Sequence, residues 1–429
     1  MIKQVYPGLL ETVYRETLPN GLDIVVLPRP GFSKKMAYFV TDFGAIHREF
    51  ELDGEKITTP AGIAHFLEHK LFDMPGGRDV SQEFAAMGAS PNAFTSYDMT
   101  AYYFSCTENF DACLKLLLEF VSTPYFTEES VAKEQGIIGQ EIGMYEDNPD
   151  SCSFEMLAGA MYENHPVREA ILGTRESIAQ ITPELLYACH KAFYRPGNMI
   201  LCVMGEVDPE AVARIAREQL PAEDLVQVTR RNSWQEPMTC KTPLVTRRME
   251  VAQPMFQLGF KQEPAEDGEA AARAEMVGEL AAEVLFGEAS QLYLKLYESG
   301  LIDNSFGGGF DTVKVIEMLV ASGDSDQPEK IREEILSEVG RILKEGVPEA
   351  DFLRLKRSAM GRRVRDLDSF NSTIFRICAY HFVGFDYLNF PALYEQVDIP
   401  QVLYFLQQVV KPERAAMSII YPKESVTEA

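Results

Sequence analysis

Two patterns of hydrophobic residues alternate along the first half of this chain, one typical of strands and the other typical of helices. Short apolar runs that fit strands occupy residues 23–27, 36–43, 100–106 and 199–205. Apolar positions three and four residues apart, which fit helices, occur in residues 110–121, 127–145 and 183–193. This mixture predicts a globular domain in which helices pack on a sheet.

The second half of the chain repeats this order of elements. A strand-like run at residues 257–260 precedes helical patterns at residues 270–286, at residues 329–344 and from about residue 348 onward. Between the halves, residues 221–243 are rich in prolines and polar residues, which predicts a linker. Because 429 residues exceed one ordinary core, we expect two domains, residues 1–220 and 244–429.

The composition narrows the classes of partner. A net charge of −25 argues against nucleic acid and against anionic membrane surfaces, and it favours cationic peptides in solution. No long uncharged apolar run predicts a membrane span, and the first residues lack the apolar core of a signal peptide, so we expect a cytoplasmic protein. The seven scattered cysteines form no Cys-x-x-Cys pair and are expected to be reduced thiols.

The most specific chemical signal is the trio His65, Glu68 and His69. On a helix, offsets of three and four residues place these side chains on one face. Two imidazoles one turn apart suit zinc, and a neighbouring carboxylate suits proton transfer from water. Thr59 is the predicted cap of this helix, followed by Pro60 at its first position. The alternative is two unrelated histidines beside a surface glutamate.

A catalytic zinc ion usually has a third protein ligand. Residues 127–145 fit a helix capped by Thr127 that places two carboxylates among isoleucines. The stripe expected to face the core consists of Glu134, Ile137, Ile138 and Glu141. Carboxylates in such a stripe need cations or a metal ion, unless the stripe is an ordinary solvated helix face.

The order His-x-x-Glu-His is that of the inverzincins, and it resembles the M16 metallopeptidases, the family of pitrilysin, insulinase and the mitochondrial processing peptidase. In that family a glutamate well downstream of the histidines completes the site, preceded by another glutamate seven residues earlier. The resemblance implies one zinc ion per chain, held by His65, His69 and Glu141. It implies that Glu68 is the general base and that Glu134 orients a ligating histidine.

Two further segments resemble the same family. Residues 88–103 are similar to the segment after the zinc helix, where an Asn-Ala pair leads into an edge strand that pairs with substrate. By this resemblance Asn92, Ala93 and Phe94 are candidate substrate contacts, whereas taken alone they would form an ordinary turn and strand. Residues 18–26 are similar to the opening hairpin of the family, with Asn-Gly at the turn.

The resemblance also implies a fold and a function. M16 subunits are α+β, with two similar domains that each pack helices on a mainly antiparallel sheet and together form half of a clamshell. Only the first domain binds zinc. In the second half of this chain, Glu134 aligns near Lys356 and Glu141 near Arg363. The expected activity is that of a zinc-dependent metalloendopeptidase, a hydrolase that processes short or unstructured peptides in an enclosed chamber.

One departure from the family bears on partners. Many M16 peptidases carry an arginine and, seven residues on, a tyrosine that stabilise the oxyanion, but Tyr297 and Asn304 stand at these positions here. We therefore expect a heterodimer with an M16-like partner subunit that supplies these groups. A homodimer that uses other donors, or a shifted alignment, stays open. The alternatives to an enzyme are a non-catalytic scaffold and a peptide-binding maturation subunit.

Overall fold

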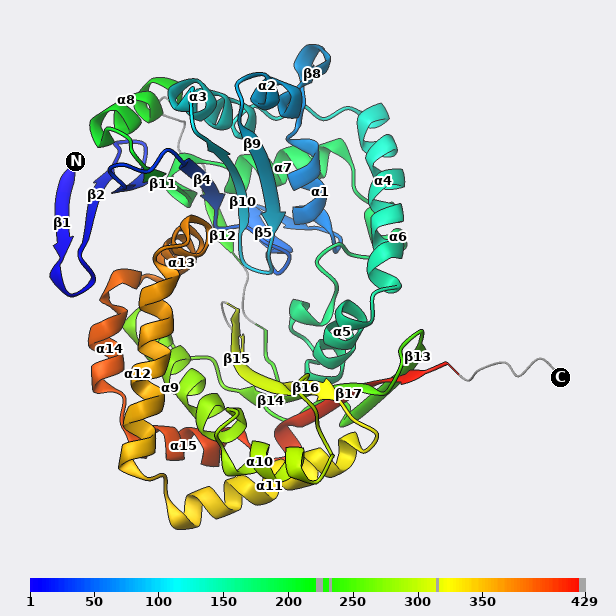
Figure 1. Cartoon of the computed structure of the whole chain (residues 1–429). Helices are drawn as coiled ribbons and strands as arrows, with labels where there is room; N and C mark the ends of the chain where they lie inside the picture. Colours follow the sequence, from blue (N-terminus) through cyan, green and yellow to red (C-terminus); the bar gives the residue numbers. More distant parts are fainter. Residues whose placement is uncertain (221–226, 231–233, 314–315, 424–429) are drawn as a thin grey trace. The chain divides into compact units, whose positions relative to one another are not determined.

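A computed structural model of the chain describes residues 1–220, 227–230, 234–313 and 316–423 (Figure 1). The chain divides into two compact units. Unit 1 comprises Met1–Ile142, Ala170–Ser233 and Asp366–Phe382. Unit 2 comprises Gly143–Glu169, Trp234–Arg365 and Val383–Ala429.

Unit 1 is built on a seven-stranded sheet. The strand order is β1 (Ile2–Tyr6), β2 (Glu11–Thr17), β3 (Asp23–Pro28), β11 (Met199–Gly205), β4 (Lys35–Thr41), β10 (Thr100–Cys106) and β9 (Ser90–Thr95). All neighbouring strands run antiparallel except β3 and β11, which are parallel. Strand β9 is therefore an edge strand, and the predicted mainly antiparallel sheet is confirmed.

The predicted hairpin at residues 18–26 is confirmed. Strands β2 and β3 pair antiparallel around it, and the backbone N–H of Leu18 donates to the carbonyl of Leu22 at 2.8 Å. Gly21 has a φ of 88°, a left-handed conformation that a glycine adopts without a steric penalty. The Asn-Gly pair thus sets the register of the first two long strands.

Helices cover the sheet of unit 1 and enclose its core. They include α1 (Ile63–Lys70), α2 (Val80–Ala86), α3 (Phe110–Val121), α4 (Glu128–Glu146), α7 (Pro183–Phe193) and α8 (Pro209–Gln219). Phe39 and Phe104 from the sheet meet Phe66 and Leu117 from the helices, and all four are fully buried. The apolar positions of residues 110–121, three and four apart, are the ones that α3 buries against this sheet.

Unit 2 is built on a five-stranded sheet. The strand order is β13 (Leu244–Met249), β17 (Ala415–Pro422), β14 (Met255–Gln262), β16 (Ile316–Asp324) and β15 (Gly307–Val313). Its helices are α5 (Pro149–Met161), α9 (Glu269–Phe286), α10 (Gln291–Glu298), α11 (Pro328–Glu345), α12 (Glu349–Asp366), α14 (Phe390–Gln396) and α15 (Ile399–Val409). The first pair, β13 and β17, is parallel and the others are antiparallel.

The two units repeat one topology. The order β3, β11, β4, β10, β9 in unit 1 corresponds to β13, β17, β14, β16, β15 in unit 2, and in both orders only the first pair is parallel. Along the chain, α1 to α4 in unit 1 therefore correspond to α9 to α12 in unit 2. The internal repeat predicted from the sequence is confirmed by this shared order.

Each half of the chain nevertheless gives one helix to the other unit. Helix α5 packs on β14 and β17 of unit 2, where the Ser418 hydroxyl donates to the Ser153 carbonyl at 2.9 Å. Most of helix α13 (Phe370–Val383) belongs to unit 1. The predicted domains, residues 1–220 and 244–429, follow the sequence repeat, whereas the spatial units interleave. Periodicity does not reveal this exchange, because a helix shows the same apolar stripe whichever sheet it covers.

Two further sequence predictions concern connections. Residues 221–226 and 231–233 of the predicted linker lie outside the described ranges, whereas residues 228–230 form β12, which pairs with β5 (Glu49–Leu52). No helix in the described ranges combines the length and apolarity that crossing a membrane requires.

The exchange of α13 predicts that residues 1–220 are an incomplete unit. Ile374 and Ile377 are buried, and burying two such side chains contributes about 3–6 kcal/mol. A peptide of residues 366–382 added to the fragment 1–220 should therefore raise its melting midpoint, by up to roughly 10 °C at saturation. The same peptide with both isoleucines changed to serine is the control. Equal melting with and without the native peptide would contradict the prediction.

Candidate metal centre

Helix α1 carries the histidine motif, but its start differs from the prediction. The predicted cap, Thr59, is not at the helix terminus, because its hydroxyl donates to the carbonyl of Arg48 at 3.2 Å. Gly62 stands before the first helical residue with a φ of 91°. A Cβ atom there would lie 2.4 Å from the Leu172 carbonyl oxygen, so the close approach of that loop requires glycine. The tertiary contact overrides the local Thr-Pro capping signal.

The helix is buried on nearly every side. Phe66 and Leu67 are fully buried on the core side, while His65 and Glu68 are 7% and 8% exposed. The ring centroids of His65 and His69 lie 4.5 Å apart, as expected for residues one turn apart. Two titratable side chains, His65 and Glu68, are thus held where solvent contributes little, and protein groups must satisfy them.

Helix α4 supplies the opposing carboxylates. Thr127 caps this helix as predicted, because the Ser130 N–H donates to its hydroxyl at 3.1 Å. Ile138 is fully buried on the core-facing stripe, but the prediction is wrong for Ile137, which is 45% exposed. The buried line runs through residues 131, 138 and 142, which leaves Ile137 at the solvent border of the helix.

The two helices bring His65, His69 and Glu141 together. The Nε2 atom of His65 lies 3.7 Å from Oε1 of Glu141, and the Nε2 atom of His69 lies 3.6 Å from Oε2. One ligand atom from each residue lies within 4.8 Å of the other two. Glu134 Oε1 lies 3.0 Å from Nδ1 of His69, so Nδ1–H donates to this carboxylate and the Nε2 atom faces Glu141.

The electrostatics of the motif follow from burial. Burial, and then the charge of His69, lower the pKa of His65 to about 3, so His65 is neutral at pH 7. Burial also raises the pKa of Glu68, against the opposing effect of a hydrogen bond from Thr95. For His69, burial lowers the pKa, but the hydrogen bond with Glu134 and the surrounding carboxylates outweigh it and raise the pKa.

The donor set fits a zinc ion. Two ligands bound to zinc at tetrahedral angles lie about 3.3–3.6 Å apart, close to the two Nε2-to-carboxylate distances. These distances are too long for hydrogen bonds, so the four atoms face each other without binding directly. Two imidazole groups, one carboxylate and a carboxylate behind His69 match the ligand and supporting groups of a catalytic zinc site.

The candidate substrate contacts lie on edge strand β9. Asn92, Ala93 and Phe94 pair with β10 on one side only. The Asn92 side-chain oxygen accepts a hydrogen bond from the Ala93 N–H at 2.8 Å. The placement on an edge is as predicted, and contact with substrate stays a prediction.

Sequence reasoning missed one residue of the site. The Thr95 hydroxyl donates to Oε2 of Glu68 at 2.6 Å and so connects the edge strand to the motif helix. The signal was present in the strand period: Thr95 alternates with Phe94 and therefore faces the opposite side of the strand. That this side faces α1 follows only from the tertiary fold.

Comparison with known proteins places the chain in a family. Residues 57–175 match the family described as Insulinase (Peptidase family M16), and residues 180–359 match its Peptidase M16 inactive domain. A Bacillus subtilis (strain 168) protein named Uncharacterized zinc protease YmfH is 39% identical over 433 aligned residues, which cover 99% of this chain and 100% of the relative. This chain belongs to peptidase family M16.

Solved structures agree with the assignment to M16. An M16-like peptidase from Alicyclobacillus acidocaldarius has a TM-score of 0.92 at 31% identity, covering 98% of this chain and 100% of the other. A protease from Helicobacter pylori has a TM-score of 0.81 at 17% identity, covering 96% and 99%, and shows the fold alone. The chain thus consists of two M16-like domains of mixed helices and sheets.

In the second M16 domain, α9 and α12 stand where α1 and α4 stand in the first. The Arg363 side chain on α12 is 4% exposed and donates to Glu275 at 2.6 Å and to Glu279 at 2.9 Å on α9. The Tyr394 hydroxyl also donates to Glu279. A guanidinium between two glutamates therefore joins the helices that correspond to the histidine and glutamate helices of the first domain.

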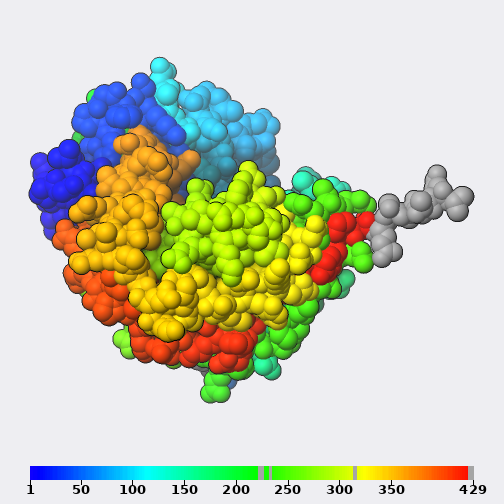
Figure 2. Space-filling model, turned by 60° about the horizontal axis from the view of Figure 1, so that its bottom comes forward, coloured from blue at the N-terminus to red at the C-terminus, as the bar shows by residue number. Residues whose placement is uncertain are grey.

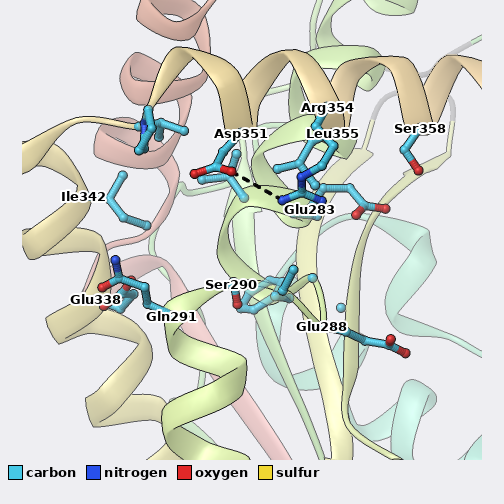
Figure 3. Close-up of a pocket in the computed structure, with 18 of the residues that line it drawn as sticks. Glu283, Glu288, Ser290, Gln291, Glu338, Ile342, Asp351, Arg354, Leu355 and Ser358 are labelled. Carbon is cyan, nitrogen blue, oxygen red and sulfur yellow. Dashed lines mark ion pairs between the residues drawn. The ribbon is translucent and has the colours of Figure 1, made fainter.

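A cavity of about 880 Å³ opens beside these helices in unit 2. Figure 3 shows its lining, with Arg354 and Asp351 extended toward each other from α12 at 3.7 Å. Arg341 is paired with Glu338 at 2.7 Å. Helices α10 and α11 lie side by side on the surface nearby (yellow-green and yellow in Figure 2). The arginines of this cavity are matched by carboxylates within the same unit.

Removing the buried guanidinium should destabilise the second domain. Arg363→Met keeps most of the side-chain volume but leaves Glu275 and Glu279 without their counter-charge. We expect a loss of about 2–4 kcal/mol in the free energy of unfolding, measured by denaturant titration. Changing both glutamates to glutamine in the same variant should recover most of it.

The matched control for this variant is Arg354→Met. The Arg354 side chain is 55% exposed and meets Asp351 at 3.7 Å, so its loss should change the free energy of unfolding by less than about 1 kcal/mol. If Arg363→Met unfolded at the same denaturant concentration as this control, the ion pairs of Arg363 between α12 and α9 would not stabilise the domain.

Proposed function

We propose that this chain is a zinc-dependent endopeptidase that hydrolyses short or unstructured peptides. His65, His69 and Glu141 would hold one zinc ion per chain. The observation that carries the proposal is the convergence of two imidazole Nε2 atoms and one carboxylate beside the buried carboxyl group of Glu68. When bound, zinc supplies a Lewis acid that polarises a carbonyl group and lowers the pKa of water.

Glu68 is the general base in this proposal. Its buried carboxylate has a raised pKa, which brings its proton affinity closer to that needed for transfer near neutral pH. Thr95 occupies Oε2 at 2.6 Å, which leaves Oε1 to take a proton from the attacking water. The same oxygen then returns the proton to the nitrogen of the leaving amine.

Glu134 sets the state of one ligand. By accepting Nδ1–H at 3.0 Å it favours the tautomer of neutral His69 that has its proton on Nδ1, which leaves Nε2 as the atom that would bind the metal. The carboxylate also orients the ring, because a hydrogen bond at the back of an imidazole restrains its rotation.

The substrate class follows from the edge strand. A free strand edge binds the backbone of an extended peptide and is sequence-tolerant, which favours unfolded or short chains. Asn92, Ala93 and Phe94 are the proposed contacts on β9. All seven cysteines are free thiols, which favours a reducing compartment such as the cytoplasm.

A partner subunit is part of the proposal. Tyr297 is 53% exposed on α10, where its ring stacks on Tyr293 at 6.0 Å, and neither it nor Asn304 offers the charge of a guanidinium. We propose that an M16-like partner, in a heterodimer or a homodimer, supplies groups for the oxyanion and encloses the chamber. The same observation favours a second candidate, a peptide-binding maturation subunit that holds substrates without cutting them.

Glu68→Gln should keep the fold and the zinc ion but lower cleavage by roughly 10²–10⁴-fold, because the amide accepts no proton from water. The measurement is mass spectrometry of a library of unstructured peptides after incubation with the zinc-loaded native or variant chain. Zinc content, measured on both proteins, is the control for an intact site.

Two outcomes separate the candidates. Cleavage by the native chain that survives in Glu68→Gln would remove Glu68 from the mechanism. A native chain that holds one zinc ion yet cuts nothing, even beside an M16-like subunit with the arginine and tyrosine, would leave the peptide-binding role instead.

Glu134→Gln should weaken zinc binding by about 10–100-fold without unfolding the chain, because the neutral amide holds the Nδ1–H of His69 less strongly. Competition with a chromophoric chelator measures this affinity. Glu128→Gln, on an exposed position in the first turn of the same helix, is the matched control and should bind zinc like the native chain. Equal affinities for both variants would exclude the orienting role of Glu134.

A further inference from the structure

Strand β9 presents two different faces beside its free edge. Thr95 points to α1, where its hydroxyl meets Glu68. Asn92 and Phe94 alternate with it and lie on the opposite face, in register with Tyr103 and Ala101 of β10. The site described above uses Thr95 and Glu68 on the first face, and on the second face it uses only Asn92 and Phe94 of β9 itself.

The second face carries a continuous series of aromatic rings. Tyr38 of β4 stacks on Tyr103 of β10, with ring centroids 4.3 Å apart. Tyr103 meets Phe94 at 6.3 Å, and Phe94 meets Phe375 of α13 at 5.8 Å. The series therefore runs from inside the sheet, across its edge strand, to a helix that comes from the second half of the chain.

Helix α13 is fixed on this face. The Tyr38 hydroxyl donates to Oδ1 of Asn371 at 3.1 Å, one turn before Phe375. Ile374 and Ile377 are buried on the side of the helix that packs inward. Phe375 nevertheless remains 42% exposed, although it touches Phe94. Helix α13 thus holds a half-exposed aromatic ring next to the strand edge proposed to bind substrate.

We infer that Phe375 and Phe94 form a subsite for an apolar side chain of the bound peptide, and that Phe375 is a specificity-determining residue. The inference rests on the proposed peptidase function. A peptide paired with β9 places every second side chain on the face of Phe94, while the side chains between them face α1. A peptide side chain on the face of Phe94 covers the exposed parts of the Phe94 and Phe375 rings. An apolar side chain gains free energy from this burial, whereas a charged side chain loses hydration.

The test is a cycle of enzyme and substrate changes. The probes are labelled ten-residue peptides of glycine, serine and alanine that carry a single phenylalanine at each position in turn, with the all-small peptide as reference. At one position, or at positions two apart, phenylalanine should raise the native kcat/KM by roughly tenfold. Phe375→Ala should remove this gain, mainly through KM, and leave the all-small peptide unchanged.

Two further variants sharpen the cycle. Phe375→Leu keeps an apolar side chain and should retain part of the preference. Phe32→Ala is the matched control, because Phe32 is 54% exposed and meets Phe370 of the same helix at 5.9 Å. It should keep the full preference. If Phe375→Ala lowered kcat/KM equally for all peptides, its role would be structural and the subsite would be refuted.

Binding separates this inference from the proposed activity. The same peptides are titrated against the Glu68→Gln variant with and without Phe375→Ala, and fluorescence anisotropy reports affinity. Selective binding that depends on Phe375, combined with a native chain that cuts none of these peptides even beside an M16-like subunit, would keep the subsite and overturn the peptidase. Cleavage without any Phe375-dependent preference, in rate or in binding, would overturn the subsite alone.

Discussion

Ionisable side chains that face one another across two packed helices need partners, and this constraint shapes both domains. In the first domain His65, His69 and Glu141 converge at 3.6–3.7 Å, too far to bind one another directly. In the second domain the corresponding helices are joined by Arg363 between two glutamates. In the second domain the guanidinium of Arg363 compensates the charge of the glutamates. In the first domain the proposed zinc ion would bind the facing side chains and would also supply a Lewis acid.

The site depends on a sheet edge as much as on the two helices. Strand β9 lies beside α1 and reaches Glu68, the proposed general base, through Thr95. Behind the same strand, α13 from the second half of the chain contributes Phe375. The exchange of α5 and α13 between the units therefore does more than stabilise them. It makes residues 366–382 part of the first unit, so that the surroundings of the proposed zinc motif come from both halves of the sequence.

The sequence was most informative where the spacing of residues along a helix determines which side chains share a face. The spacing of His65, Glu68 and His69 fixes their common face on α1, and the offset of seven residues between Glu134 and Glu141 puts both carboxylates on one face of α4. Elements that depend on distant contacts were not predictable in the same way. Helix α1 begins after Gly62 instead of at the predicted Thr59-Pro60, because the backbone of Leu172, some 110 residues further along the chain, lies close to Gly62. The exchange of α13 between the units leaves no local sequence pattern.

X-ray absorption at the zinc edge of the purified native chain tests the central claim most directly, because seven cysteines offer a competing ligand set. The account predicts one zinc ion per chain, a nitrogen and oxygen shell at about 2.0–2.2 Å and the outer scattering of two imidazole rings. Those signals should disappear when His69 is changed to alanine. A sulfur shell at about 2.3 Å, or a chain that retains no zinc when supplied with it, would contradict the account.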